Sequence, residues 1–91
     1  MQPLAQAIPR ALGQLLRGSP LSPGKVEFAW KAAVGPAMDR VTSVRLDGHV
    51  LLVEARTPQW AHEVARSSGI ILKRMQALLG DAVIRELTVR A

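Results

Sequence analysis

The chain has 91 residues, 48% of them hydrophobic and 21% charged, and its formal net charge is +5. This length and composition are typical of one small globular domain and not of a disordered segment. The chain contains no cysteine, which excludes disulfides and cysteine-based metal sites. No apolar run reaches the length of about 18 residues that crosses a bilayer, and the N-terminus lacks a signal-peptide pattern, so we expect a cytoplasmic protein without membrane contact.

The basic bias leaves two interpretations of the partner open. Nine of the twelve basic residues are arginines, and they are spread along the whole chain. Arginine suits phosphate and carboxylate recognition better than lysine does. A pI near 11.2 therefore permits nucleic acid as a partner, but a protein that is merely basic explains it about as well.

The N-terminal part of the chain predicts two helices. Leucine and isoleucine share one helical face over residues 4–16, where Pro9 either lies in the first turn or kinks the helix. Ser22 and Pro23 predict the N-cap and first position of a second helix, which ends at Gly35. The buried face of this second helix carries Val26, Trp30, Ala33 and Val34. Residues 37–41 then predict a short turn.

A β-hairpin is predicted over residues 42–56. Asp47 and Gly48 fit a two-residue type I′ turn, which would pair Leu46 with His49, Val44 with Leu51 and Thr42 with Val53. The face without charge is the expected core side, and it carries Thr42, Val44, Leu46, His49, Leu51, Val53 and Ala55. The opposite face carries Ser43, Arg45, Val50, Leu52, Glu54 and Arg56.

One long amphipathic helix is predicted after the hairpin, capped by Thr57 and running from Pro58 to Leu79. Gly69, in its middle, indicates a kink or a close backbone approach. The apolar stripe consists of Trp60, Ala61, Val64, Ala65, Ser68, Ile71, Leu72, Met75, Leu78 and Leu79. Residues 82–90 predict a last strand with Val83, Leu87 and Val89 inward, and Arg85 either at its frayed end or pointing out.

The predicted order is therefore α-α-β-β-α-β, an α+β fold with helices packed on one face of a three-stranded sheet. We expect a single domain over residues 1–91, with an N-terminal helix and loop over 1–21 and a main α-β-β-α-β unit over 22–91. The predicted core consists of Trp30, Trp60, Val44, Leu46, Leu51, Val53, Val64, Ile71, Leu72, Met75, Leu87 and Val89.

No motif for catalysis or metal binding stands out. His49 and His62 lack a second ligand at metal-site spacing, and no carboxylate pair, nucleophile elbow or glycine-rich phosphate loop occurs. We expect that the protein is not an enzyme and has no cofactor and no small-molecule substrate.

Trp30 and Trp60 could stack on nucleic-acid bases, but both lie on the apolar stripes of their helices, which favours a role as core anchors. Truncating Trp60 to alanine should therefore lower the free energy of unfolding by about 3–5 kcal/mol.

Two surfaces remain as candidates for function. On the outer sheet face, arginines lie beside Glu54 and Glu86, as either cross-strand ion pairs or part of a binding surface that includes Val50 and Leu52. The long helix carries a second basic strip, either solvated charges or phosphate contacts. The candidate nucleic-acid contacts are Arg45, Arg56, Arg66, Lys73, Arg74 and Arg90, and the candidate partner contacts are Val50 and Leu52.

Three segments in order, AWKAAVG, LDGHVLLVEARTPQWAHEVA and ILKRMQALLGDAVIRELTVR, resemble the DciA family over residues 4–90. That family's pattern is a tryptophan helix ending in Val-Gly, a hairpin with G-x-L-x-V, a second tryptophan helix, a Leu-Gly and a closing strand. Here His49 and Val50 separate Gly48 from Leu51, a small variation. Many members also carry a disordered extension that contributes to function.

The resemblance implies a KH-like fold and a role in DNA replication. DciA proteins bind the hexameric replicative helicase DnaB, help to load it on single-stranded DNA, and bind DNA themselves. The chain has no G-x-x-G loop, with which KH domains clamp nucleic acid, so any DNA contact should be weak, electrostatic and salt-sensitive. The alternatives are a KH-like RNA-binding module without a helicase role and a purely protein–protein interaction domain.

Overall fold

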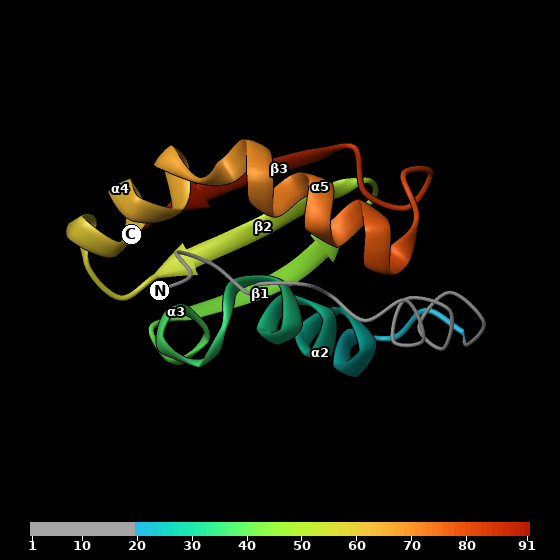
Figure 1. Ribbon diagram of the computed structural model, residues 1–91, viewed down its shortest axis with the longest axis horizontal. Helices are drawn as coiled ribbons and strands as arrows, with labels where there is room; N and C mark the ends of the chain where they lie inside the picture. The colour runs from blue at the N-terminus through green and yellow to red at the C-terminus, as the bar shows by residue number, and fades with distance from the viewer. Residues whose placement is uncertain (1–19) are drawn as a thin grey trace.

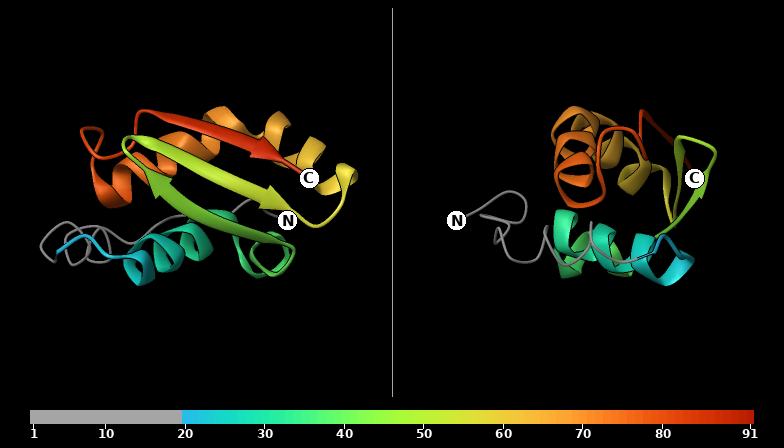
Figure 2. Two further views of the ribbon diagram at one scale, coloured as in Figure 1. Left: turned by 180° about the vertical axis from the view of Figure 1, so that it is seen from behind. Right: turned by 90° about the vertical axis from the view of Figure 1, so that its right-hand side faces the viewer.

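The computed structural model describes residues 20–91, so the helix predicted over residues 4–16 lies outside the described part of the chain. The described elements follow the order α2 (Pro23–Val34), α3 (Pro36–Arg40), β1 (Thr42–Asp47), β2 (Val50–Ala55), α4 (Pro58–Arg66), α5 (Ser68–Leu79) and β3 (Glu86–Arg90). The helices cover one face of the sheet and leave its other face open (Figure 1, Figure 2). The predicted α+β class and helix-covered three-stranded sheet are confirmed.

Helix α2 begins and ends where the sequence predicts. The Ser22 side chain accepts a hydrogen bond from the backbone N–H of Lys25 at 3.2 Å, and Pro23 occupies the first turn. Gly35 ends the helix with a positive φ of 87°, a conformation that glycine adopts without a Cβ clash. The residues after it form the short helix α3 and not the predicted turn, because Pro36 has the fixed φ that suits a first helical position.

The hairpin register differs from the prediction by two residues. Leu46 pairs with Leu51, Val44 with Val53 and Thr42 with Ala55, so the turn consists of Gly48 and His49. Gly48 has a φ of 61°, and no non-glycine residue from 20 to 91 has a positive φ. A type I′ turn needs a positive φ at both central residues, whereas a type II′ turn needs it only at the first, where glycine is preferred. The turn therefore fits type II′ and not the predicted type I′. Because the shift is an even number of residues, each strand residue stays on its predicted face of the sheet. The exception is His49, which lies in the turn.

Strand β2 is central, with β1 antiparallel and β3 parallel to it. Strand β3 begins at Glu86, four residues later than predicted, because residues 81–83 form a turn after Gly80. The segment before β3 is tied to the hairpin turn, since the backbone N–H of Arg85 donates to the carbonyl oxygen of His49 at 2.8 Å. Ile84, absent from the predicted core, is fully buried, and Arg85 points to solvent.

The prediction of a single long helix is wrong in one respect, because the structure has two helices, α4 and α5, with a break at Ser67. Ser67 has φ −98° and ψ 7°, outside the helical range, so the break lies two residues before Gly69. Apart from its chain neighbours and the backbone of its own helix, no described atom lies within 4 Å of a Cβ built on Gly69, which excludes a close approach of another element. Ala65 is exposed, although it was predicted to face the core, whereas Trp60 is half-buried and packs against the core.

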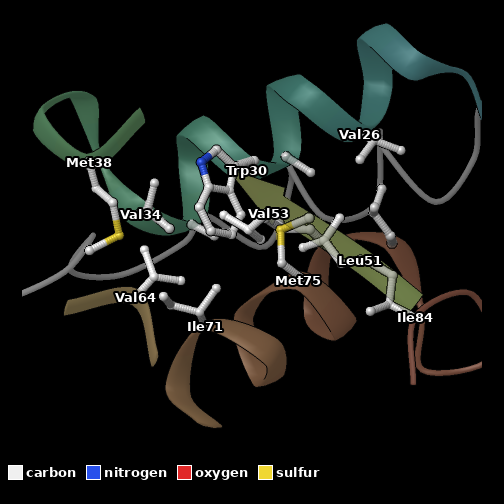
Figure 3. Close-up of a cluster of buried hydrophobic side chains, with 14 residues drawn as sticks. Val26, Trp30, Val34, Met38, Leu51, Val53, Val64, Ile71, Met75 and Ile84 are labelled. Carbon is white, nitrogen blue, oxygen red and sulfur yellow. The ribbon is translucent and has the colours of Figure 1, made fainter. Parts of the chain in front are cut away.

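The core lies between α2, the α4–α5 helices and the inner face of the sheet, with Trp30 near its centre (Figure 3). The buried members are Val26, Ala29, Trp30, Ala33, Val34, Met38, Leu51, Val53, Val64, Ile71, Met75, Leu78, Leu79 and Ile84. The remaining predicted core residues are partly buried against it, namely Val44, Leu46, Trp60, Leu72, Leu87 and Val89.

Trp30 also makes the polar contact that joins three elements. Its indole Nε1–H donates to the Thr42 hydroxyl oxygen at 2.9 Å, and that hydroxyl donates to the carbonyl oxygen of Met38 at 2.7 Å. Since a buried indole N–H without a partner is destabilising, this chain of bonds fixes α2 and α3 against the start of β1.

Replacing Trp30 by alanine should lower the free energy of unfolding by about 3–5 kcal/mol or prevent folding, because it leaves a large cavity and removes the hydrogen bond that the Thr42 hydroxyl accepts. Phe28 on the same helix is 52% exposed, whereas Trp30 is 1% exposed, so Phe28→Ala is the matched control and should cost less than about 1 kcal/mol. Urea unfolding followed by circular dichroism measures both. Equal losses would contradict the assignment of the core.

Gly69→Ala should stabilise the chain by about 0.5–1 kcal/mol, because Gly69 lies in a helix with space for a Cβ and without a positive φ. Gly48→Ala is the control and should destabilise by about 1 kcal/mol, since Gly48 has a positive φ. Thermal unfolding compares the two variants. A loss of stability in Gly69→Ala would show that this position needs glycine.

Candidate functional site

The open face of the sheet has three rows of side chains, as the strand register defines them. The first row is Ser43, Glu54 and Arg90, the second Arg45, Leu52 and Thr88, and the third Asp47, Val50 and Glu86. No described helix covers these rows, as the rear view in Figure 2 shows. Arg56 follows the end of β2 and is exposed. This face therefore brings together Arg45, Arg90, Val50 and Leu52 from the predicted set.

The open face is not basic. Arg90 is already paired, because its Nη2 lies 3.0 Å and its Nε 3.2 Å from Oε2 of Glu54. The third row adds two carboxylates, Asp47 and Glu86, with no cation in the row. The three rows thus hold two arginines and three carboxylates, a net charge of −1. A polyanion such as DNA gains no overall attraction from such a face.

The centre of the open face is partly apolar. Val50 and Leu52 lie on the central strand and are half-buried. A shallow depression of about 300 Å³ lies beside Leu52 and is bordered by Arg45, Glu54 and Arg90. An apolar centre with charged groups of both signs around it is the composition of a protein–protein interface.

The basic strip lies on the other side of the molecule, along α4 and α5. Residues 58–79 contain Arg66, Lys73 and Arg74 against the single carboxylate Glu63, which gives a net charge of +2. Arg66 Nη1 lies 3.1 Å from Oε1 of Glu63, Lys73 is exposed and Arg74 is half-buried. Residues 20–91 as a whole carry ten basic and seven acidic residues, a net +3, so most of that excess lies on this strip.

Ile70 lies within the basic strip and was not singled out from the sequence. It is 56% exposed, and Lys73 and Arg74 follow it by three and four residues on the same side of α5. The predicted apolar stripe places Ile71 inward, which is where the structure has it, so Ile70 must point outward. A large aliphatic residue among cations gives the strip an apolar contact beside its charges.

A third surface was also missed, a groove between α2 and β1. Phe28 and Leu21 border it, and each is 52% exposed. The sequence holds a signal for this groove, because Phe28 falls outside the Val26, Trp30 and Ala33 stripe of its helix. The chain has only one phenylalanine, and it faces solvent.

The described residues hold no group of three or more His, Cys, Asp or Glu side chains that could bind a metal ion. Nδ1 of His49 lies 3.2 Å from the carbonyl oxygen of Val83, so this histidine helps to hold the hairpin turn against the segment before β3. Within residues 20–91, no helix combines the length and the apolar character that a bilayer span requires.

A comparison with protein families identifies the family of the chain. The family described as Dna[CI] antecedent, DciA, matches residues 3–89, which is nearly the whole chain. No curated protein matches the chain.

Proposed function

The chain belongs to the DciA family, and we propose that it is a DNA-replication adaptor that binds the replicative helicase DnaB and assists its loading on single-stranded DNA. The observation that carries the proposal is the family match over residues 3–89, because membership of this family implies a helicase-loading role. A KH-like fold is likewise proposed for the chain.

The DNA contact is proposed for the basic strip of α4 and α5. Its net charge of +2 contrasts with the −1 of the open sheet face, and association with a phosphate backbone follows local charge. Lys73 is the exposed lysine of the strip, and Ile70 beside it offers apolar contact to a base or sugar. Arg45, Arg56 and Arg90 remain candidates of lower rank, since Arg90 already binds Glu54.

The helicase contact is proposed for the open sheet face. Val50 and Leu52 supply a half-buried apolar centre on a strand whose backbone is held on both sides by neighbouring strands. A rigid surface of this kind loses little conformational entropy when a partner binds. Carboxylates and arginines around it would set the orientation of the partner.

Lys73→Gln should weaken binding to a single-stranded oligonucleotide, and the slope of log affinity against log salt should fall by about 0.7, because one phosphate contact is lost. Fluorescence anisotropy at several salt concentrations measures both quantities. Lys31→Gln, on α2, is the matched control and should leave the slope unchanged.

Glu54→Gln, on the open sheet face, also tests the assignment of the DNA contact to the basic strip. It frees Arg90 and makes the open face more positive, so DNA bound there would bind more tightly. We expect no change in affinity. A tighter complex with Glu54→Gln would place the DNA on the sheet, and an unaltered slope with Lys73→Gln would contradict the proposed contact at Lys73. Affinity for RNA at least equal to that for single-stranded DNA would favour an RNA-binding module.

The chain should co-purify with the replicative helicase of the same organism, with and without single-stranded DNA. Leu52→Ser should reduce the retained helicase strongly, because truncating a central apolar contact at an interface commonly costs more than about 1 kcal/mol. Ile70→Ser is the matched control, a similar truncation on the basic strip, and should leave retention unchanged when DNA is absent. No retention of helicase by the unaltered chain would contradict the proposed function.

A further inference from the structure

Strand β1 is an edge strand whose outward backbone groups can be assigned. The backbone N–H of Arg56 donates to the carbonyl oxygen of Val41 at 2.9 Å, which makes Val41 and Arg56 a hydrogen-bonded pair just beyond the strands. Such pairs alternate along an antiparallel ladder, so Ser43, Arg45 and Asp47 direct their backbone groups toward β2. The N–H and C=O groups of the other three residues point to the free edge: Thr42, Val44 and Leu46.

This edge lacks three of the features that keep edge strands from pairing with other chains, namely proline, lysine and a β-bulge, although it carries the charged residues Arg45 and Asp47. Its sequence, TSVRLD, contains no proline or lysine, and its register with β2 runs through six residues without a bulge. Within residues 20–91 no strand pairs with this edge, and a regular edge of this kind is a template for an additional strand. The backbone of β1 therefore offers alternating donors and acceptors over five residues, from Thr42 to Leu46.

A groove with apolar borders runs along the same edge. It consists of two depressions of about 430 Å³ each, and Glu27 and Val44 line both of them. Phe28 borders the end near Thr42, and Leu21 borders the end near Leu46. Both side chains are more than half exposed, and Figure 2 shows α2 alongside β1. Apolar surface thus lies next to unpaired backbone, which is the arrangement that binds an extended peptide.

The charges of the groove specify the partner further. At the Thr42 end, Glu27 and Asp39 outnumber Lys31, so this end is negative. Neither carboxylate takes part in the ion pairs found among residues 20–91, which are Arg66–Glu63 and Arg90–Glu54. A nucleic acid would be repelled here, whereas a lysine or arginine of a peptide would be attracted.

We propose that the free edge of β1 is a docking site for an extended segment of a partner protein, which binds as a fourth, antiparallel strand. Apolar side chains at alternate positions of the segment pack against Phe28, Val44 and Leu46, and a basic residue at its C-terminal end lies beside Glu27 and Asp39. Antiparallel pairing is the more stable orientation per residue. The site is separate from the basic strip and lies at the edge of the open sheet face, where Ser43 and Arg45 border both. The inference rests on the groove and the free edge, not on the proposed function.

The test uses the capped peptide TVTVTVTK, in which three valines and the lysine share one face, titrated into the ¹⁵N-labelled chain. The amide signals of Thr42, Val44, Leu46 and Phe28 should shift. Val44→Pro should weaken binding at least about fivefold, since it removes an outward N–H worth about 1 kcal/mol at a position where an edge strand tolerates proline. Val44→Ala shortens the side chain but keeps the N–H, and should stay within about threefold of the unaltered chain.

Four results of the titrations would overturn the proposal. The first is a lack of amide shifts along β1, and the second is binding of the peptide TVTVTVTE as tight as that of TVTVTVTK. The third is binding by Val44→Pro as tight as by the unaltered chain, in a sample whose other amide signals show an intact fold. The fourth is a shift of the same amide signals with a single-stranded oligonucleotide. A dimer of the unligated chain in light scattering, with its Val44 signal broadened by concentration, would instead assign the edge to a second copy and would also overturn it.

Discussion

The buried indole of Trp30 determines where α2 lies, and the exposed surfaces depend on that position. Its ring fills the space between the helices and the sheet, and its N–H bonds to Thr42, whose hydroxyl in turn bonds to Met38. The bond reaches Thr42 at the first residue of β1, so α2 must run alongside the β1 edge. This placement leaves the groove beside Phe28 open and keeps the opposite face of the sheet free of described helices.

Charge is distributed unevenly over the surfaces that this packing creates. The α4–α5 side carries a net +2, the open sheet face carries −1, and the groove by Thr42 is negative. A protein that must hold DNA and a protein partner together benefits from such separation, because each partner then meets its own surface. The net charge of +5 alone does not reveal this uneven distribution of charge, since basic residues are spread evenly in the sequence.

Periodicity and caps predicted most of the fold, since Ser22-Pro23 and Thr57-Pro58 start helices through local hydrogen bonds and fixed φ angles. The hairpin register was wrong because Asp-Gly favours one turn locally, whereas the chain forms the Gly48–His49 turn that lets Arg85 bond to His49. The break at Ser67 has no strong signal in composition. The surfaces were harder to predict, because pairing of Arg90 with Glu54 and exposure of Phe28 depend on tertiary neighbours.

The central claim is that one small domain uses separate surfaces for DNA and for the helicase. The most direct measurement is an amide and methyl NMR titration of the full chain, first with a single-stranded oligonucleotide and then with the native helicase. The account predicts that DNA shifts or broadens the signals of Lys73 and Ile70, and that the helicase affects those of Val50 and Leu52. Responses of the same residues to both partners, or no response to the helicase, would contradict it.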